Sequence, residues 1–195
     1  MRRMHPFAVL VFQVMIVVAL VSVPEATRAA KGPSFEGEQI AFALPDLDGR
    51  LVSSNDPRFD GRVLLIDLWA TYCPPCLTEI PTFVDLQDRF GERGLVVVGI
   101  AFEADEDPEE RRSRLREFVE QRGINYLILD GGNWSSLPDA LPGLRDVRGM
   151  PVEILVDREA RVVEARNGYG YKKRWARKLE ATLTELLDAA DRKGP

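Results

Sequence analysis

The chain has 195 residues, of which 45% are hydrophobic and 29% charged, and this composition fits one globular domain with a short appendage rather than a disordered or fibrous protein. Its formal net charge is −5, and without residues 1–29 the remaining 23 basic and 30 acidic residues give −7. A negative surface disfavours nucleic acid and anionic lipid as partners. The single histidine, His5, lies in the first segment.

The N-terminus has the pattern of an export signal. Arg2 and Arg3 precede an apolar stretch at residues 7–23, and small residues follow it. This layout predicts that residues 1–29 form a cleaved signal peptide. The apolar stretch also reaches the lower length limit of a bilayer-spanning helix, so an uncleaved membrane anchor is the alternative. Either way we expect an exported domain, periplasmic or tethered outside the cytoplasmic membrane, over residues 34–190.

The rest of the chain alternates strand and helix patterns. In order, the predicted elements are a hairpin at 42–44 and 51–52, a strand at 63–69, a helix at 74–90, a strand at 95–102, a helix from Asp107 to Gly123, a strand at 126–129, a short helix near 135–147, a hairpin at 152–156 and 161–165, and a helix at about 172–190. Apolar runs such as 95–102 are typical of strands covered on both faces.

This order predicts an α/β fold, with a mixed central sheet flanked by helices on both faces and an added N-terminal hairpin. In open sheets of this kind, functional sites lie at the carboxyl ends of the strands. Cys73 follows the strand 63–69 and therefore lies at that edge.

The chain's two cysteines stand three residues apart, in the segment Cys73-Pro74-Pro75-Cys76 at the start of a predicted helix. Unpaired amides and the helix dipole lower the pKa of a thiol at this position, so Cys73 is predicted to be the nucleophile. Cys76, one turn further in, is predicted to resolve the mixed disulfide. Pro74 and Pro75 fix the turn but remove two amide donors, so we expect a mild pKa depression.

Other uses of a Cys-x-x-Cys pair fit less well. A stapling disulfide gains most by closing a long loop, and this one closes almost none. Zinc would need two more Cys or His ligands, which the exported part lacks. Haem attachment would need a histidine at position 77, where the chain has Leu77. We therefore predict a redox pair without metal or cofactor; a non-enzymatic thiol module that handles metal is the alternative.

The segment from Leu68 to Cys76 resembles the active-site segment of thioredoxin-like proteins, and is most similar to exported TlpA/ResA-type thiol–disulfide oxidoreductases. Pro81 falls where the thioredoxin active-site helix carries its proline. Gly149-Met150-Pro151 is similar to the cis-proline loop. The resemblance implies a cis peptide between Met150 and Pro151 that packs against the cysteines and exposes backbone to an extended substrate; a trans proline that starts a strand is the alternative.

The same resemblance suggests roles for three further residues. Asp67, within an apolar strand, would accept a proton as the resolving thiol ionises, although many TlpA-like proteins have Asn there. Glu103 resembles the buried glutamate of the ResA group, or is an ordinary solvated acid. Trp69 either contacts the substrate or walls the core beneath the site.

The resemblance implies an exported monomer that reduces disulfides in other proteins and is re-reduced by a membrane electron donor. Cytochrome c maturation is one outlet that the family suggests. A net oxidant or isomerase of the same fold is the rival hypothesis, because members of this fold have reduction potentials between about −270 and about −120 mV.

Overall fold

The computed structural model describes residues 38–167 and 173–191, all within the unit Lys31–Pro195. The leader or anchor predicted at 1–29, with its apolar stretch 7–23, lies outside these residues. Within the two described ranges, no helix is both long and apolar enough to cross a membrane.

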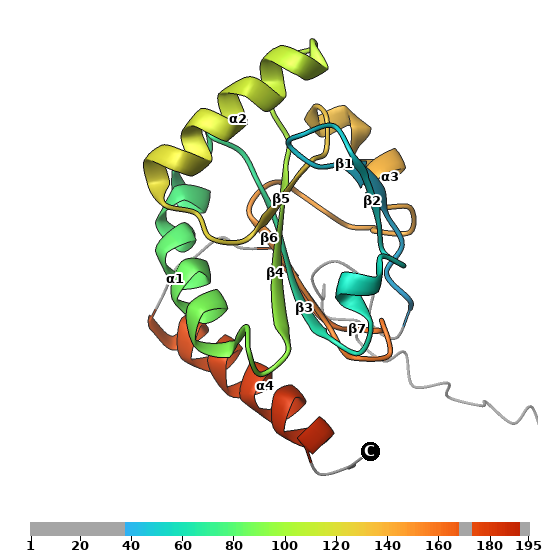
Figure 1. The fold of residues 1–195 in the computed structure, drawn as a ribbon, viewed down its shortest axis with the longest axis vertical. Helices are drawn as coiled ribbons and strands as arrows, with labels where there is room; N and C mark the ends of the chain where they lie inside the picture. The colour runs from blue at the N-terminus through green and yellow to red at the C-terminus, as the bar shows by residue number, and fades with distance from the viewer. Residues whose placement is uncertain (1–37, 168–172, 192–195) are drawn as a thin grey trace, which may run out of the picture. The chain divides into compact units, whose positions relative to one another are not determined.

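A five-stranded mixed sheet forms the centre of the fold, with strand order β5-β4-β3-β6-β7 (Figure 1). Its strands are β3 (Val63–Trp69), β4 (Leu95–Ala101), β5 (Leu127–Asp130), β6 (Val152–Val156) and β7 (Val162–Asn167). The pairs β3·β4 and β4·β5 are parallel, whereas β3·β6 and β6·β7 are antiparallel. A separate antiparallel hairpin joins β1 (Ala43–Pro45) to β2 (Leu51–Ser53).

Both faces of the sheet are covered, which explains why β3 is buried at every position. Side chains of α1 (Pro74–Phe90), α2 (Pro108–Arg122) and α4 (Lys173–Asp191) contribute to the core on one face. The hairpin, η1 (Pro57–Phe59) and α3 (Leu137–Ala140) pack on the other. Figure 1 shows α1 and α4 on the opposite side of the sheet from β1, β2 and α3. The predicted α/β fold, with a mixed sheet and an extra hairpin, is confirmed.

Local signals set the helix ends at the site. Cys73 is the N-cap of α1, and Pro74 and Pro75 occupy its first turn, where a missing N–H costs nothing within the helix. Asp107 caps α2 by accepting hydrogen bonds from the backbone N–H groups of Glu109 (3.0 Å) and Glu110 (2.8 Å). Both starts agree with the prediction from sequence.

Gly99 of β4 leaves the space that the aromatic side chains behind the site need. A Cβ at this position would lie 2.7 Å from Ile128 Cδ1 and 2.9 Å from Trp69 Nε1. Trp69 stacks at a tilt on Phe118 of α2, with ring centroids 5.5 Å apart. The glycine therefore allows Trp69 to pack directly against the sheet.

The helix predicted near 135–147 is wrong in extent. The chain forms the 3₁₀ turn η2 (Trp134–Ser136) and then the single helical turn α3, which ends at Ala140. Leu141 is the C-cap, and Pro142 and Gly143 come next, with Gly143 at a positive φ of 100°. These two residues stop the helix, because proline lacks an N–H and the backbone of Gly143 is not helical.

Candidate active site

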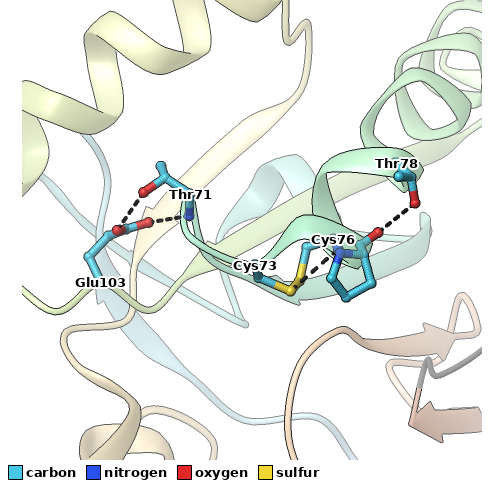
Figure 2. The surroundings of a disulfide bond; sticks show 6 residues. Thr71, Cys73, Cys76, Thr78 and Glu103 are labelled. Carbon is cyan, nitrogen blue, oxygen red and sulfur yellow. Dashed lines mark hydrogen bonds between the residues drawn. A yellow bond between two sulfur atoms is a disulfide. The ribbon is translucent and has the colours of Figure 1, made fainter.

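The two cysteines meet in the turn between β3 and α1. Cys73 and Cys76 form a disulfide with their Cα atoms 5.3 Å apart. The N–H of Cys76 donates to Cys73 Sγ at 3.3 Å, and the N–H of Leu77 donates to the Cys73 carbonyl at 3.1 Å. Because Pro74 and Pro75 have no N–H, the Cys76 amide is the first donor of α1 that the Cys73 sulfur meets. Figure 2 shows this contact across the disulfide.

The surroundings of the pair make the two sulfurs unequal. Cys73 is 8% exposed and Cys76 is fully buried. Pro74 is exposed, Pro75 is half-buried, and Tyr72 is 54% exposed. An incoming disulfide can therefore approach Cys73 over an apolar rim, whereas Cys76 can be reached only from within the protein.

Glu103 holds the segment that leads into the cysteine turn. Its carboxylate accepts hydrogen bonds from the Thr71 backbone N–H at 2.7 Å and the Thr71 hydroxyl at 2.8 Å (Figure 2). Glu103 is 6% exposed, which excludes the alternative of a solvated acid. Burial raises the pKa of this carboxyl, and the two hydrogen bonds from Thr71 oppose that rise.

A buried ion pair supports the loop that carries Glu103. Arg111 of α2 donates to both carboxylate oxygens of Asp130 at the end of β5, at 2.6 and 3.1 Å. Arg111 also donates to the Asp105 carbonyl at 2.6 Å, and the N–H of Glu103 donates to the Gly132 carbonyl at 2.9 Å. The loops after β4 and β5 are thus tied to each other and to α2.

The predicted cis-proline loop is confirmed as a cis peptide between Met150 and Pro151. Pro151 is buried directly before β6, and the half-buried Met150 packs against the core cluster that contains both cysteines. Trp69 is fully buried in that same cluster. Of the two interpretations of Trp69, its burial favours the one in which it walls the core beneath the site, because the side chain has no exposed surface in this structure.

Asp67 lies in β3 with no exposed surface, and neither carboxylate oxygen has a hydrogen-bond partner among the described residues. Burial, followed by the negative charge of Glu153, raises the pKa of Asp67 well above its ordinary value. Glu153 stands directly opposite Asp67 in the β3·β6 pairing. Asp67 is therefore part of a group of buried acids and not an isolated one.

Sequence reasoning missed two members of this group, Glu79 and Glu153, which are 3% and 4% exposed. Burial raises the pKa of Glu79 to about 9, helped by the negative charges of Glu153 and Asp67. Burial also raises the pKa of Glu153, to about 7, against the opposing charge of Arg166. A signal was present: Glu79 lies three residues after Cys76 on the core-facing stripe of α1, and Glu153 interrupts an apolar strand as Asp67 does.

Among residues 38–167 and 173–191, no cluster of three or more His, Cys, Asp and Glu side chains has an arrangement that could hold a metal ion. The fold and the cysteine turn define a thioredoxin-fold protein with a redox-capable dithiol.

The chain belongs to the AhpC/TSA family, whose sequence profile matches residues 36–178. It is 26% identical over 134 residues to the thiol-disulfide oxidoreductase ResA of Halalkalibacterium halodurans, and the match covers 68% of each chain. It is also 26% identical over 145 residues to ResA of Bacillus subtilis, covering 73% of each. The predicted resemblance to TlpA/ResA-type proteins is confirmed, and the chain is a thiol–disulfide oxidoreductase of the thioredoxin fold.

A solved structure supports the fold. The secreted thiol-disulfide isomerase of Corynebacterium glutamicum superposes with a TM-score of 0.65, covering 83% of this chain and 95% of that one. Its sequence identity is 17%, so the likeness concerns the fold alone.

Proposed function

We propose that this protein is an exported reductase of protein disulfides that uses Cys73 as nucleophile and Cys76 as resolving thiol. The observation that carries the proposal is the inequality of the two cysteines: Cys73, at the start of α1, keeps 8% of its surface exposed, and Cys76 has none. Such an arrangement directs the substrate to one sulfur and reserves the other for intramolecular attack.

The reaction runs in two exchanges. The Cys73 thiolate attacks a sulfur of the substrate disulfide, forms a mixed disulfide and releases the first substrate sulfur as a thiolate. Cys76 then loses its proton and attacks Cys73 Sγ, which closes the Cys73–Cys76 bond and releases the second substrate thiolate. The substrate gains two electrons, and the protein takes the disulfide form seen in this structure.

The substrate would lie along the rim beside Cys73. Pro74, Pro75 and Met150 supply apolar contact, and the backbone before Pro151 pairs with an extended substrate segment. Glu103 positions the turn through Thr71. Asp67, one of the buried acids, influences proton transfer from the resolving thiol through its charge. A membrane electron donor would regenerate the dithiol, and the apocytochrome c Cys-x-x-Cys pair is one substrate of the right chemistry.

A trapping experiment tests the exchange. Cys76→Ser, expressed in the full chain, leaves Cys73 able to form mixed disulfides that nothing resolves. We expect disulfide-linked partners to accumulate in the exported fraction, to disappear on reduction, and to be absent from the double variant Cys73→Ser/Cys76→Ser. If Cys76→Ser traps no more protein than the double variant does, the proposed function is wrong.

The direction of electron flow is tested by equilibrating the purified protein with glutathione redox buffers. A reductase requires a potential towards the lower end of the range of the fold, near about −270 mV. A value near about −120 mV would identify a net oxidant instead.

A further inference from the structure

Three carboxyls gather behind Cys76, from three different elements. Asp67 comes from β3, Glu153 faces it across the β3·β6 pairing, and Glu79 lies on α1 one turn after Cys76. All three are at least 96% buried. Side chains three apart on a helix are neighbours, so Glu79 lies beside the resolving thiol.

All three carboxyls are buried away from water and close in space, so they cannot all be ionised at once. They therefore share protons. If both Glu79 and Glu153 were ionised, neither oxygen of Glu153 would have a donor among the described residues. A proton on Glu79 supplies that donor. Burial, followed by the charges of Glu153 and Asp67, raises the pKa of Glu79, and hydrogen bonding of its proton to Glu153 adds a smaller contribution. The same interaction works against the rise in the pKa of Glu153. Of the two, Glu153 is the one that ionises more readily.

Glu153 also lines a small cleft between β6, β7 and α4. The cleft holds about 10 Å³, roughly the space of one water molecule. Its lining consists of Leu65, Glu153, Leu155, Glu164, Arg166, Trp175 and Leu179. Neither Asp67 nor Glu79 is among them, so of the three buried acids Glu153 alone meets this cleft. Arg166, which stabilises a negative charge on Glu153, is 27% exposed at its side chain.

We propose that Glu153 is the outlet of a proton path that runs from the Cys76 thiol through Glu79 to solvent at the cleft between β6, β7 and α4. The path rests on the proposed disulfide exchange, because only that reaction requires Cys76 to lose its proton inside the protein. Glu153 accepts the proton from Glu79 and touches no substrate. It is therefore a positioning residue and not a catalytic one.

The proton balance of the resolving step is simple. Cys76 gives its proton to Glu79 while Glu79 passes its own carboxyl proton to the Glu153 carboxylate. The Cys76 thiolate attacks Cys73 Sγ, the Cys73–substrate bond breaks, and the substrate leaves as a thiolate. Glu153 then releases its proton to water in the cleft, and the Arg166 guanidinium stabilises the carboxylate that remains.

Other charges near Glu153 will influence its titration. Asp67 faces it from β3 and Glu79 from α1, and both disfavour its ionisation when they are charged. On β7, Arg166 favours the ionised form and Glu164 disfavours it. Lys178 of α4 pairs with Glu164 at 2.9 Å and partly offsets that charge.

The test uses the full chain and measures separately the formation of the mixed disulfide on Cys73 and its resolution by Cys76. Reduced protein is mixed with oxidised glutathione, quenched at intervals and analysed by mass, so that the mixed disulfide on Cys73 and its resolution by Cys76 are timed separately across pH. We expect Glu153→Gln to slow resolution about tenfold near neutral pH and to remove one ionisation from its pH profile. The rate at which the mixed disulfide forms should not change. Glu185→Gln, on the exposed side of α4, is the matched control and should behave as wild type.

A purely structural role for Glu153 predicts a different result. The proposal is overturned if Glu153→Gln resolves the mixed disulfide with the wild-type pH profile, whatever its thermal stability. If that variant does not fold, Arg166→Gln decides: losing the guanidinium should move the same ionisation to higher pH, and an unmoved profile overturns the path. A wild-type protein that forms no mixed disulfide at all would overturn the proposed function, and the path with it.

Discussion

At the scale of single residues, Glu103 shows how a buried acid can act on the site without touching a sulfur. Its two oxygens accept from the amide and the hydroxyl of Thr71, two residues before Cys73. Without the Glu103 carboxylate, the Thr71 amide loses its hydrogen-bond acceptor. An unsatisfied buried donor costs about 1–3 kcal/mol of folding free energy. Glu103 therefore fixes the path by which the chain leaves β3 for the cysteine turn.

We expect Glu103→Ala to lower the unfolding free energy by about 1–3 kcal/mol and to slow mixed-disulfide formation by Cys73, because the turn is no longer held. Glu103→Gln should retain most of both properties. Its amide oxygen can accept from the Thr71 N–H, and the Thr71 hydroxyl can accept from its NH₂ group. Urea unfolding and rapid-quench kinetics with oxidised glutathione measure the two effects. A Gln variant as impaired as the Ala variant would mean that the charge, and not the hydrogen bonding, is what matters.

At the scale of elements, the carboxyl edge of the sheet depends on how α2 is tied to the ends of β4 and β5. The Arg111–Asp130 pair is 8% and 1% exposed, and Arg112 Nη1 lies 3.5 Å from the same Asp130 carboxylate. Buried pairs of this kind are costly to break from one side, because the remaining charge is left without its partner.

Two arginines of α2 provide a matched test of this connection. Arg111→Ala should cost about 3–5 kcal/mol of unfolding free energy, because Asp130 stays buried with only the more distant Arg112. Arg114→Ala removes pairs to Asp105 and Glu110 at an arginine that is 60% exposed, and should cost at most about 1 kcal/mol. Denaturant titration of both variants measures the difference. Equal losses would contradict the assignment of Arg111 as the internal support.

The elements that sequence predicted best are those with strong local signals. The apolar runs gave β3 and β4, and the Asp107–Pro108 start and the Gly123 end gave α2. The short helix after β5 was placed too long, although Pro142 and Gly143, which stop it, stand in the sequence. Periodicity over so short a stretch cannot show which of its residues are helical.

At the scale of the whole molecule, the cysteine turn and the cis peptide before Pro151 were predictable because each follows from a short motif. The group of buried acids was not. Asp67 stood out as an acid in an apolar strand, but Glu79 and Glu153 come from distant segments and meet it only through the β3·β6 register and the packing of α1. The position of each acid in an apolar pattern was visible in the sequence, but no local pattern shows that the three acids meet.

These acids should make the stability of the whole fold fall as pH rises. A carboxyl with a folded pKa above its unfolded value binds more protons in the native state, so its stabilising contribution is complete below the unfolded pKa and is lost as pH rises towards the folded one. For Glu79 that window extends from 4.5 to about 9. We expect the unfolding free energy of the wild type to decline across this window by about 1–3 kcal/mol more than that of Glu79→Gln, which has no proton to lose there. Urea titrations at several pH values, with Glu185→Gln as control, measure both slopes, and parallel curves for wild type and Glu79→Gln would show that the buried acids do not hold protons in the folded state.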